Sequence, residues 1–180
     1  MASKVKWVLI VSSVLLLGLV LLAPVASADK KKVDAKYKDK YQNIEVTRFD
    51  VKEGVDFPAD WMLTMTEEIV KQLQETKKLK QVLRESETPT DPAAPTLKLT
   101  GTVTQYDKGS RAARYMIGFG AGKTKVVAHI KIADKATGEV LFEDDVDGKV
   151  IIGVIGGESV GATRGLAKEV AGKTKKEFFK

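Results

Sequence analysis

The chain contains no cysteine and only one histidine among its 180 residues. Without cysteine there are no disulfides and no thiol for lipid attachment, so the fold depends on its core alone. A single histidine, His129, with no cysteine beside it also excludes the ordinary zinc ligand sets. Neither Ser110 nor Ser159 lies in a nucleophile elbow, so we expect His129 to be a surface residue and not a catalytic base.

Complete motifs for phosphate and calcium binding are also missing. Two Gly-Lys-Thr triplets, at 122–124 and 172–174, resemble the end of a P-loop, but neither has the glycine required five positions earlier. A run of alternating acids before Gly148 resembles a calcium loop, but its twelfth position is Val154 where a glutamate is needed. We therefore predict no cofactor, no metal and no nucleotide, and a protein that is not an enzyme; a hydrolase is the least favoured class.

The first 28 residues have the layout of an export signal. Lys4 and Lys6 precede an apolar run from Trp7 to Ala23, and Ala26 and Ala28 supply the small residues of a cleavage site. We predict a signal peptide over residues 1–28 and export to the periplasm or cell envelope without a lipid anchor. An uncleaved anchor is the alternative, because the run just reaches the length of a membrane span.

Removal of this signal would leave 152 residues with a net charge of +4, enough for one domain. Residues 29–42 are predicted to be a basic flexible lead, since six lysines crowd positions 30 to 40. Such a lead is either a solvated tail or a tether to an anionic surface. Residues 43–180 form the single folded domain, and export argues against nucleic acid as a partner.

Hydrophobic periodicity predicts an α+β domain. We expect a mostly antiparallel sheet of about four to five strands with two main helices packed on one face. The apolar parity shifts between Val46 and Phe49, which indicates a bulge or a strand end. The predicted strands cover 44–51, 81–84, 97–103, 126–132 and 140–146, the last two as a hairpin, and the predicted helices cover 58–76 and 159–178.

Two glycine-rich segments contain the candidate binding residues. Positions 108 to 125 hold five basic residues and no acid around clustered glycines, and 150–157 is apolar. If these segments are exposed, they form a patch that can bind a partner. If they are packed, they lie as tight loops on the sheet. Solvated charge is the alternative for the basic residues. The candidate contact residues are Lys108, Arg111, Arg114, Phe119, Lys123, Ile151 and Ile155.

Several glycine-centred motifs between Leu97 and Gly165 resemble bacterial envelope proteins of family 4410 of domains of unknown function. These motifs are Gly101-Thr102-Val103, Gly109-Ser110-Arg111, Gly118-Phe119-Gly120-Ala121-Gly122, Ala136-Thr137-Gly138-Glu139 and Gly156-Gly157. The resemblance implies an exported protein with no defined activity. Family members are often lipoproteins, and this chain departs from that form because it lacks cysteine.

These observations predict a non-enzymatic exported envelope protein. We expect it to bind an envelope protein or copies of itself through the two glycine-rich segments. The alternative is a binder of an anionic lipid or an acidic glycan, which the basic charge favours.

Overall fold

The computed structural model describes residues 30–108, 124–149 and 158–180. No helix in these three ranges is long and apolar enough to cross a membrane. The predicted signal peptide lies outside them. The elements are a short 3-10 helix η1 (Ala35–Tyr37), strands β1 (Asn43–Val46), β2 (Asp50–Val51), β3 (Gln81–Arg84), β4 (Thr96–Asp107), β6 (Lys125–Asp134) and β7 (Val140–Lys149), and helices α1 (Ala59–Glu75) and α3 (Glu158–Phe178).

The strands form one mixed sheet in the order β3-β1-β4-β6-β7, with β2 paired to β4. The pairs β4–β6 and β6–β7 are antiparallel, whereas β1 lies parallel to both β3 and β4. This confirms an α+β fold with two main helices and a mostly antiparallel sheet. The expectation of four to five strands was one too low, because the run from 44 to 51 splits into β1 and β2 at the predicted parity shift.

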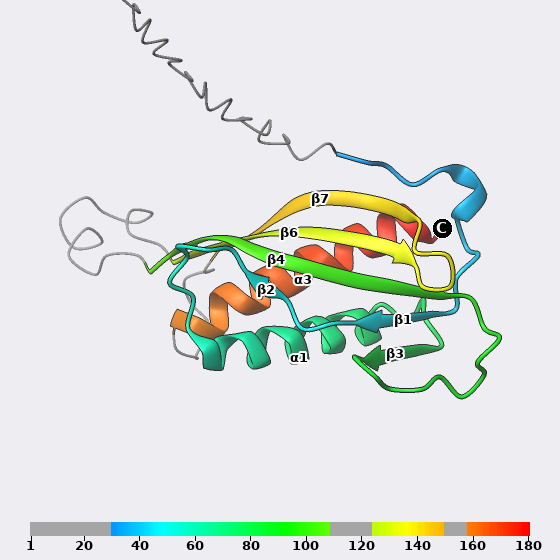
Figure 1. The fold of residues 1–180 in the computed structure, drawn as a ribbon, viewed down its shortest axis with the longest axis horizontal. Helices are drawn as coiled ribbons and strands as arrows, with labels where there is room; N and C mark the ends of the chain where they lie inside the picture. Colours follow the sequence, from blue (N-terminus) through cyan, green and yellow to red (C-terminus); the bar gives the residue numbers. More distant parts are fainter. Residues whose placement is uncertain (1–29, 109–123, 150–157) are drawn as a thin grey trace, which may run out of the picture.

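Both helices lie side by side across one face of the sheet (Figure 1). The helix α1 buries Met65, Ile69 and Leu73 against this face, since these residues recur every four positions along the helix. The helix α3 buries Leu166 and Phe178 in the same core. The other face of β4, β6 and β7 carries the polar side chains of the strand alternation and no helix in the described part of the chain.

A glycine sets the distance between α3 and the sheet. A β-carbon on Gly148, in β7, would lie 2.3 Å from the carbonyl oxygen of Ala162 and 2.6 Å from the backbone nitrogen of Leu166. Only a residue without a side chain allows the helix backbone to come this close. The start of α3 is therefore fixed directly over the end of β7.

The described part of the lysine-rich lead is bound to the domain at several points. Lys31 pairs with Glu143 on the edge of β7 through two backbone hydrogen bonds of 3.0 and 3.3 Å. The N–H of Asp39 donates to the carbonyl of Phe178 at 2.7 Å, and Tyr41 is buried against the Phe178 ring. The lead thus passes along the outer edge of β7 and then beside the end of α3 (Figure 1).

Candidate functional site

The described residues that flank the two glycine-rich segments lie at one end of the sheet. In the register, Lys125 lies between Asp107 of β4 and Lys149 of β7, and the Thr124 hydroxyl donates to the carbonyl of Lys108 at 3.1 Å. The points where the segments leave the sheet are therefore neighbours. Lys108 is exposed at this end, whereas Arg111, Arg114, Phe119, Lys123, Ile151 and Ile155 lie outside the described residues.

The sole histidine lies on the open face of the sheet between two acids. His129 Nε2 is 2.7 Å from Glu143 Oε1, and His129 Nδ1 is 2.9 Å from Asp145 Oδ1. Lys131 Nζ lies 3.1 Å from the same oxygen of Glu143. Two carboxylate neighbours favour the doubly protonated ring, in which both nitrogens donate.

The electrostatics of this cluster follow from its burial and its hydrogen bonds. Burial would lower the pKa of His129, but the hydrogen bonds to Asp145 and Glu143 outweigh it and raise the pKa above its usual value. Burial would raise the pKa of Glu143, but bonds from His129 and Lys131 outweigh that and lower it. Neither ring nitrogen is free to take a proton from a nucleophile, and no group of three metal-ligating side chains occurs in the described ranges. The arrangement is that of an ion-pair cluster.

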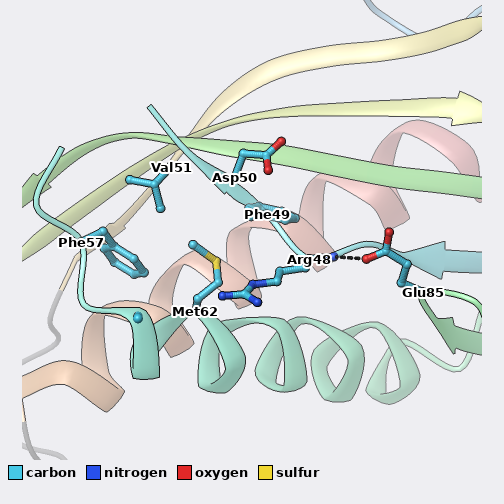
Figure 2. Close-up of a pocket in the computed structure, with 8 residues that line it drawn as sticks. Arg48, Phe49, Asp50, Val51, Phe57, Met62 and Glu85 are labelled. Carbon is cyan, nitrogen blue, oxygen red and sulfur yellow. Dashed lines mark hydrogen bonds between the residues drawn. The ribbon is translucent and has the colours of Figure 1, made fainter. Parts of the chain in front are cut away.

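A second feature is a recess beside β2, at the side of the sheet away from β7, which we call the β2 notch. It has a volume of about 500 Å³ and is lined by residues of the β1–β2 segment, of the start of α1 and of the end of β3. In Figure 2, Val51, Phe57 and Met62 point toward one another, and the Arg48 side chain lies above α1. The lining residues are Arg48, Phe49, Asp50, Val51, Phe57, Ala59, Met62 and Glu85.

The notch exists because β3 stops while β2 continues along β4. The last register pair of β3 joins Arg84 to Val46, and β2 has β4 as its only strand neighbour in the described residues. The N–H of Lys52 donates to the carbonyl of Val103 on β4 at 2.9 Å. Because adjacent residues of a strand turn their backbone groups to opposite edges, the N–H and carbonyl of Val51 face outward into the notch.

Charged groups close the notch on the side of β3. The N–H of Arg48 already faces outward, and it donates to Glu85 Oε2 at 3.3 Å. Beyond it, Arg84 holds Glu67 of α1 with two hydrogen bonds of 2.7 and 2.8 Å. The free strand position beside β2 therefore starts at the Glu85 carboxylate and runs past Val51.

Two large apolar side chains in or beside the notch are exposed. Val51 is 40% exposed and Leu63 is 69% exposed, the two large hydrophobic side chains that stand out on the described surface. Leu63 lies between Ala59 and Glu67 at four-residue spacing, so these three share one side of α1, and that side faces the end of β3. Phe49 packs directly over Gly101, whose missing side chain leaves room for its ring.

Sequence reasoning did not find the β2 notch. It placed Phe49 and Val51 on one strand face and Met62 on a helix. The signal that identifies the notch is a strand edge without a described neighbour, next to apolar side chains. This edge depends on where β3 ends relative to β2, which long-range strand pairing decides.

Comparison with protein families identifies a match over much of the chain. The family model described as "Domain of unknown function (DUF4410)" matches residues 55–153. No curated protein sequence matches the chain.

Comparison with solved structures finds the same fold at low sequence identity. A subunit of the PelC dodecamer from Paraburkholderia phytofirmans superposes with a TM-score of 0.55 at 15% identity, covering 82% of this chain and 97% of that one. The protein XCC0632 from Xanthomonas campestris, described as DUF330, gives a TM-score of 0.52 at 11% identity, covering 80% of this chain and 90% of the other. At these identities the likeness is one of fold.

Proposed function

The chain belongs to the DUF4410 family, a domain of unknown function, and from this premise we propose that it is a non-enzymatic envelope protein that assembles with copies of itself. The observation that carries the proposal is the fold it shares with PelC, which was solved as a dodecamer and of which this chain covers 97%. A fold that already occurs in a dodecamer makes self-association the first mode of action to test.

The distribution of surface features supports this proposal. Two glycine-rich segments with basic and apolar residues leave the sheet at one end, and an apolar notch opens at the β2 edge. At the notch, a second protein surface could provide partners for the outward backbone of Val51 and for the apolar lining. The proposed contact residues in the segments are Arg111, Arg114, Phe119, Ile151 and Ile155, with Lys108 and Lys123 at the borders.

The chemistry of the described side chains supports a role other than catalysis. His129, the only histidine, is held by two carboxylates. Within the described ranges, every buried side-chain nitrogen and oxygen has a hydrogen-bond partner, so none is poised unpaired as a nucleophile or a base. The hydrolase alternative predicts an activity that disappears in a His129→Ala variant.

An envelope location is part of the proposal, and it rests on the export signal expected at residues 1–28. Binding of an anionic lipid or an acidic glycan remains the alternative prediction. Several lysines of the lead are engaged within the chain, because Lys30 pairs with Asp144 at 3.3 Å and Lys40 pairs with Asp134 at 3.7 Å. These pairs reduce the charge available to an anionic surface.

Size-exclusion chromatography with light scattering tests the proposal. The chain is expressed from its full sequence and purified as the cell processes it. We expect a mass of at least twice that of one processed chain, persisting at high salt. A monomer at every concentration, with vesicles of anionic lipid pelleting it only at low salt, would favour the lipid alternative and contradict self-assembly.

A further inference from the structure

We propose that the β2 notch is the docking site for an extended basic segment of a second copy of this chain, added as a strand beside β2. This inference rests on the proposed self-assembly and names the surface that performs it. Its first support is geometric, since the Val51 backbone faces outward and no strand of the described ranges occupies the position next to it. Extended peptides bind such edges through backbone hydrogen bonds, while pockets for alternate side chains give specificity.

The two faces of the sheet beside β2 differ in polarity. Val51 lies opposite Val103 in the register and faces the helices, whereas Asp50 lies opposite Thr102 and faces the open side of the sheet. An added strand would therefore turn every second side chain onto the apolar lining formed by Val51, Phe57 and Met62. Its other side chains would lie near Asp50. The site requires an alternation of apolar residues with polar or basic ones.

Charge identifies the kind of segment that fits. The charged residues that line the notch are the two acids Asp50 and Glu85 and one base, Arg48, which leaves a net charge of −1. The chain as a whole carries +6, so the rest of it is strongly basic. A second copy therefore brings opposite charge to this corner, which speeds encounter and fixes orientation.

The sequence contains a segment with the required alternation. In residues 111–120, Tyr115, Ile117 and Phe119 share one parity, and Arg114 precedes them on the other. Laid out as a strand, this order puts three apolar side chains on the apolar lining and an arginine toward Asp50. No acid occurs between Lys108 and Lys125, so nothing in this segment opposes the charge of the notch.

Because the docking surface and the docking segment are different parts of the chain, the interface is head-to-tail. Such an interface forms a ring when the rotation between copies closes and a filament when it does not. Each copy then uses one notch and donates one segment.

A charge-swap series tests the docking by sedimentation velocity. We expect Asp50→Lys with Glu85→Lys to weaken self-association by about tenfold or more, because two acids of the notch become basic. The matched control is Glu75→Lys with Glu169→Lys, which changes the net charge equally on exposed residues outside the notch and should leave the association within about twofold. Reversal of the segment, Arg111→Glu with Arg114→Glu, should weaken association alone and restore it when combined with the notch pair.

A second variant does not depend on charge. Leu63 is 69% exposed and lies one turn of α1 from Ala59, which lines the notch, so Leu63→Asp leaves the core intact while it places a charge beside the notch. It should weaken association by about tenfold with an unchanged thermal unfolding curve. If the wild-type chain assembles and neither the notch pair nor Leu63→Asp weakens it, the docking inference is wrong while self-assembly stands. If the wild-type chain does not assemble, the proposed function fails as well.

Disulfide trapping distinguishes docking between two copies from contact within one chain. Because the chain has no native cysteine, only the introduced cysteines can form the disulfide. Chains with Val51→Cys are mixed with chains carrying Phe119→Cys and oxidised. We expect a mixed dimer, and none with Lys175→Cys, an exposed position near the end of α3, as the partner. A disulfide that forms only when both cysteines are in one chain would overturn docking between copies.

Discussion

The two edges of the sheet are completed in different ways. At the β7 edge the chain uses its own lead, because Lys31 pairs with Glu143 and both Lys30 and Lys173 bind Asp144. At the β2 edge no described strand follows, and the Val51 backbone faces an apolar notch of about 500 Å³. Proteins usually cover, shorten or charge their sheet edges to prevent unwanted pairing. An edge kept open over apolar side chains therefore suggests a contact surface, whereas the β7 edge is part of the folded domain.

The largest expected effect lies on the closed side of the molecule. Gly148→Ala should cost about 3 kcal/mol of unfolding free energy, because its β-carbon would overlap the backbone of α3 near Ala162 and Leu166. Urea unfolding measures the loss. The control is Gly172→Ala in α3, where nothing lies within 4 Å of the added β-carbon and the change should stabilise the fold by up to about 1 kcal/mol. Equal effects of the two substitutions would mean that α3 does not rest on Gly148.

The next effect concerns the ion pairs that close the β7 edge. Asp144 is 12% exposed and receives Lys30 at 3.3 Å as well as Lys173, so Asp144→Asn should cost about 1 to 2 kcal/mol at pH 7. Burial would raise the pKa of Asp144, but its bonds with Lys173 and Lys30 outweigh it and lower the pKa.

The pH dependence of this variant has a definite sign. A lowered pKa in the folded state adds stability above the pKa of the unfolded chain, and that stability is lost as the pH falls through the folded value. The difference between wild type and Asp144→Asn in urea should therefore shrink below about pH 4. A difference that stays constant down to pH 2 would contradict an ion-pair role for this carboxylate.

A smaller effect is expected on the open face. His129→Gln should cost about 0.5 to 1 kcal/mol near pH 5.5, because the charged ring bridges Glu143 and Asp145. The pKa of His129 is raised, so this stability is present below its unfolded pKa and is lost as the pH rises through the folded value. Thermal unfolding at pH 5.5 and pH 9 should show the difference at the lower pH only. A greater loss at pH 9 would rule out the ion-pair assignment.

The smallest effect on stability is predicted beside the β2 notch. Leu63→Ser should change the unfolding free energy by less than about 0.5 kcal/mol, because Leu63 is 69% exposed. The buried neighbour Met62, on the same turn of α1, provides the contrast, and Met62→Ser should cost about 2 to 4 kcal/mol. A large loss of stability in Leu63→Ser would indicate that this residue belongs to the core and is not available to a partner.

Local patterns were sufficient to predict most elements of the fold. The four-residue repeat of Trp61, Met65, Ile69 and Leu73 predicted a helix at 58–76, and α1 covers 59–75. The predicted final helix at 159–178 corresponds to α3 at 158–178. The alternation after Val126 and the turn at Gly138 gave the β6–β7 hairpin, where Gly138 adopts a positive φ of 74°. These features depend on neighbours in sequence, and periodicity records them.

The sheet order and the notch could not be predicted in this way. The strand β1 lies between β3 and β4, both of which follow it far along the chain, and parallel pairing of this kind leaves no turn signal. The place where β3 ends relative to β2 decides whether Val51 is covered. No pattern around Val51 or Met62 indicates that both line the same recess. The basic and glycine-rich candidates, by contrast, were visible in composition alone.

Light scattering on the wild-type chain and on the Asp50→Lys, Glu85→Lys variant, side by side over a concentration series, tests the central claim most directly. The account predicts a wild-type mass at least twice that of one processed chain and a variant that dissociates toward the single-chain mass. It also predicts that the Glu75→Lys, Glu169→Lys control stays assembled. A wild-type chain that keeps the mass of a single processed chain at every concentration would contradict it.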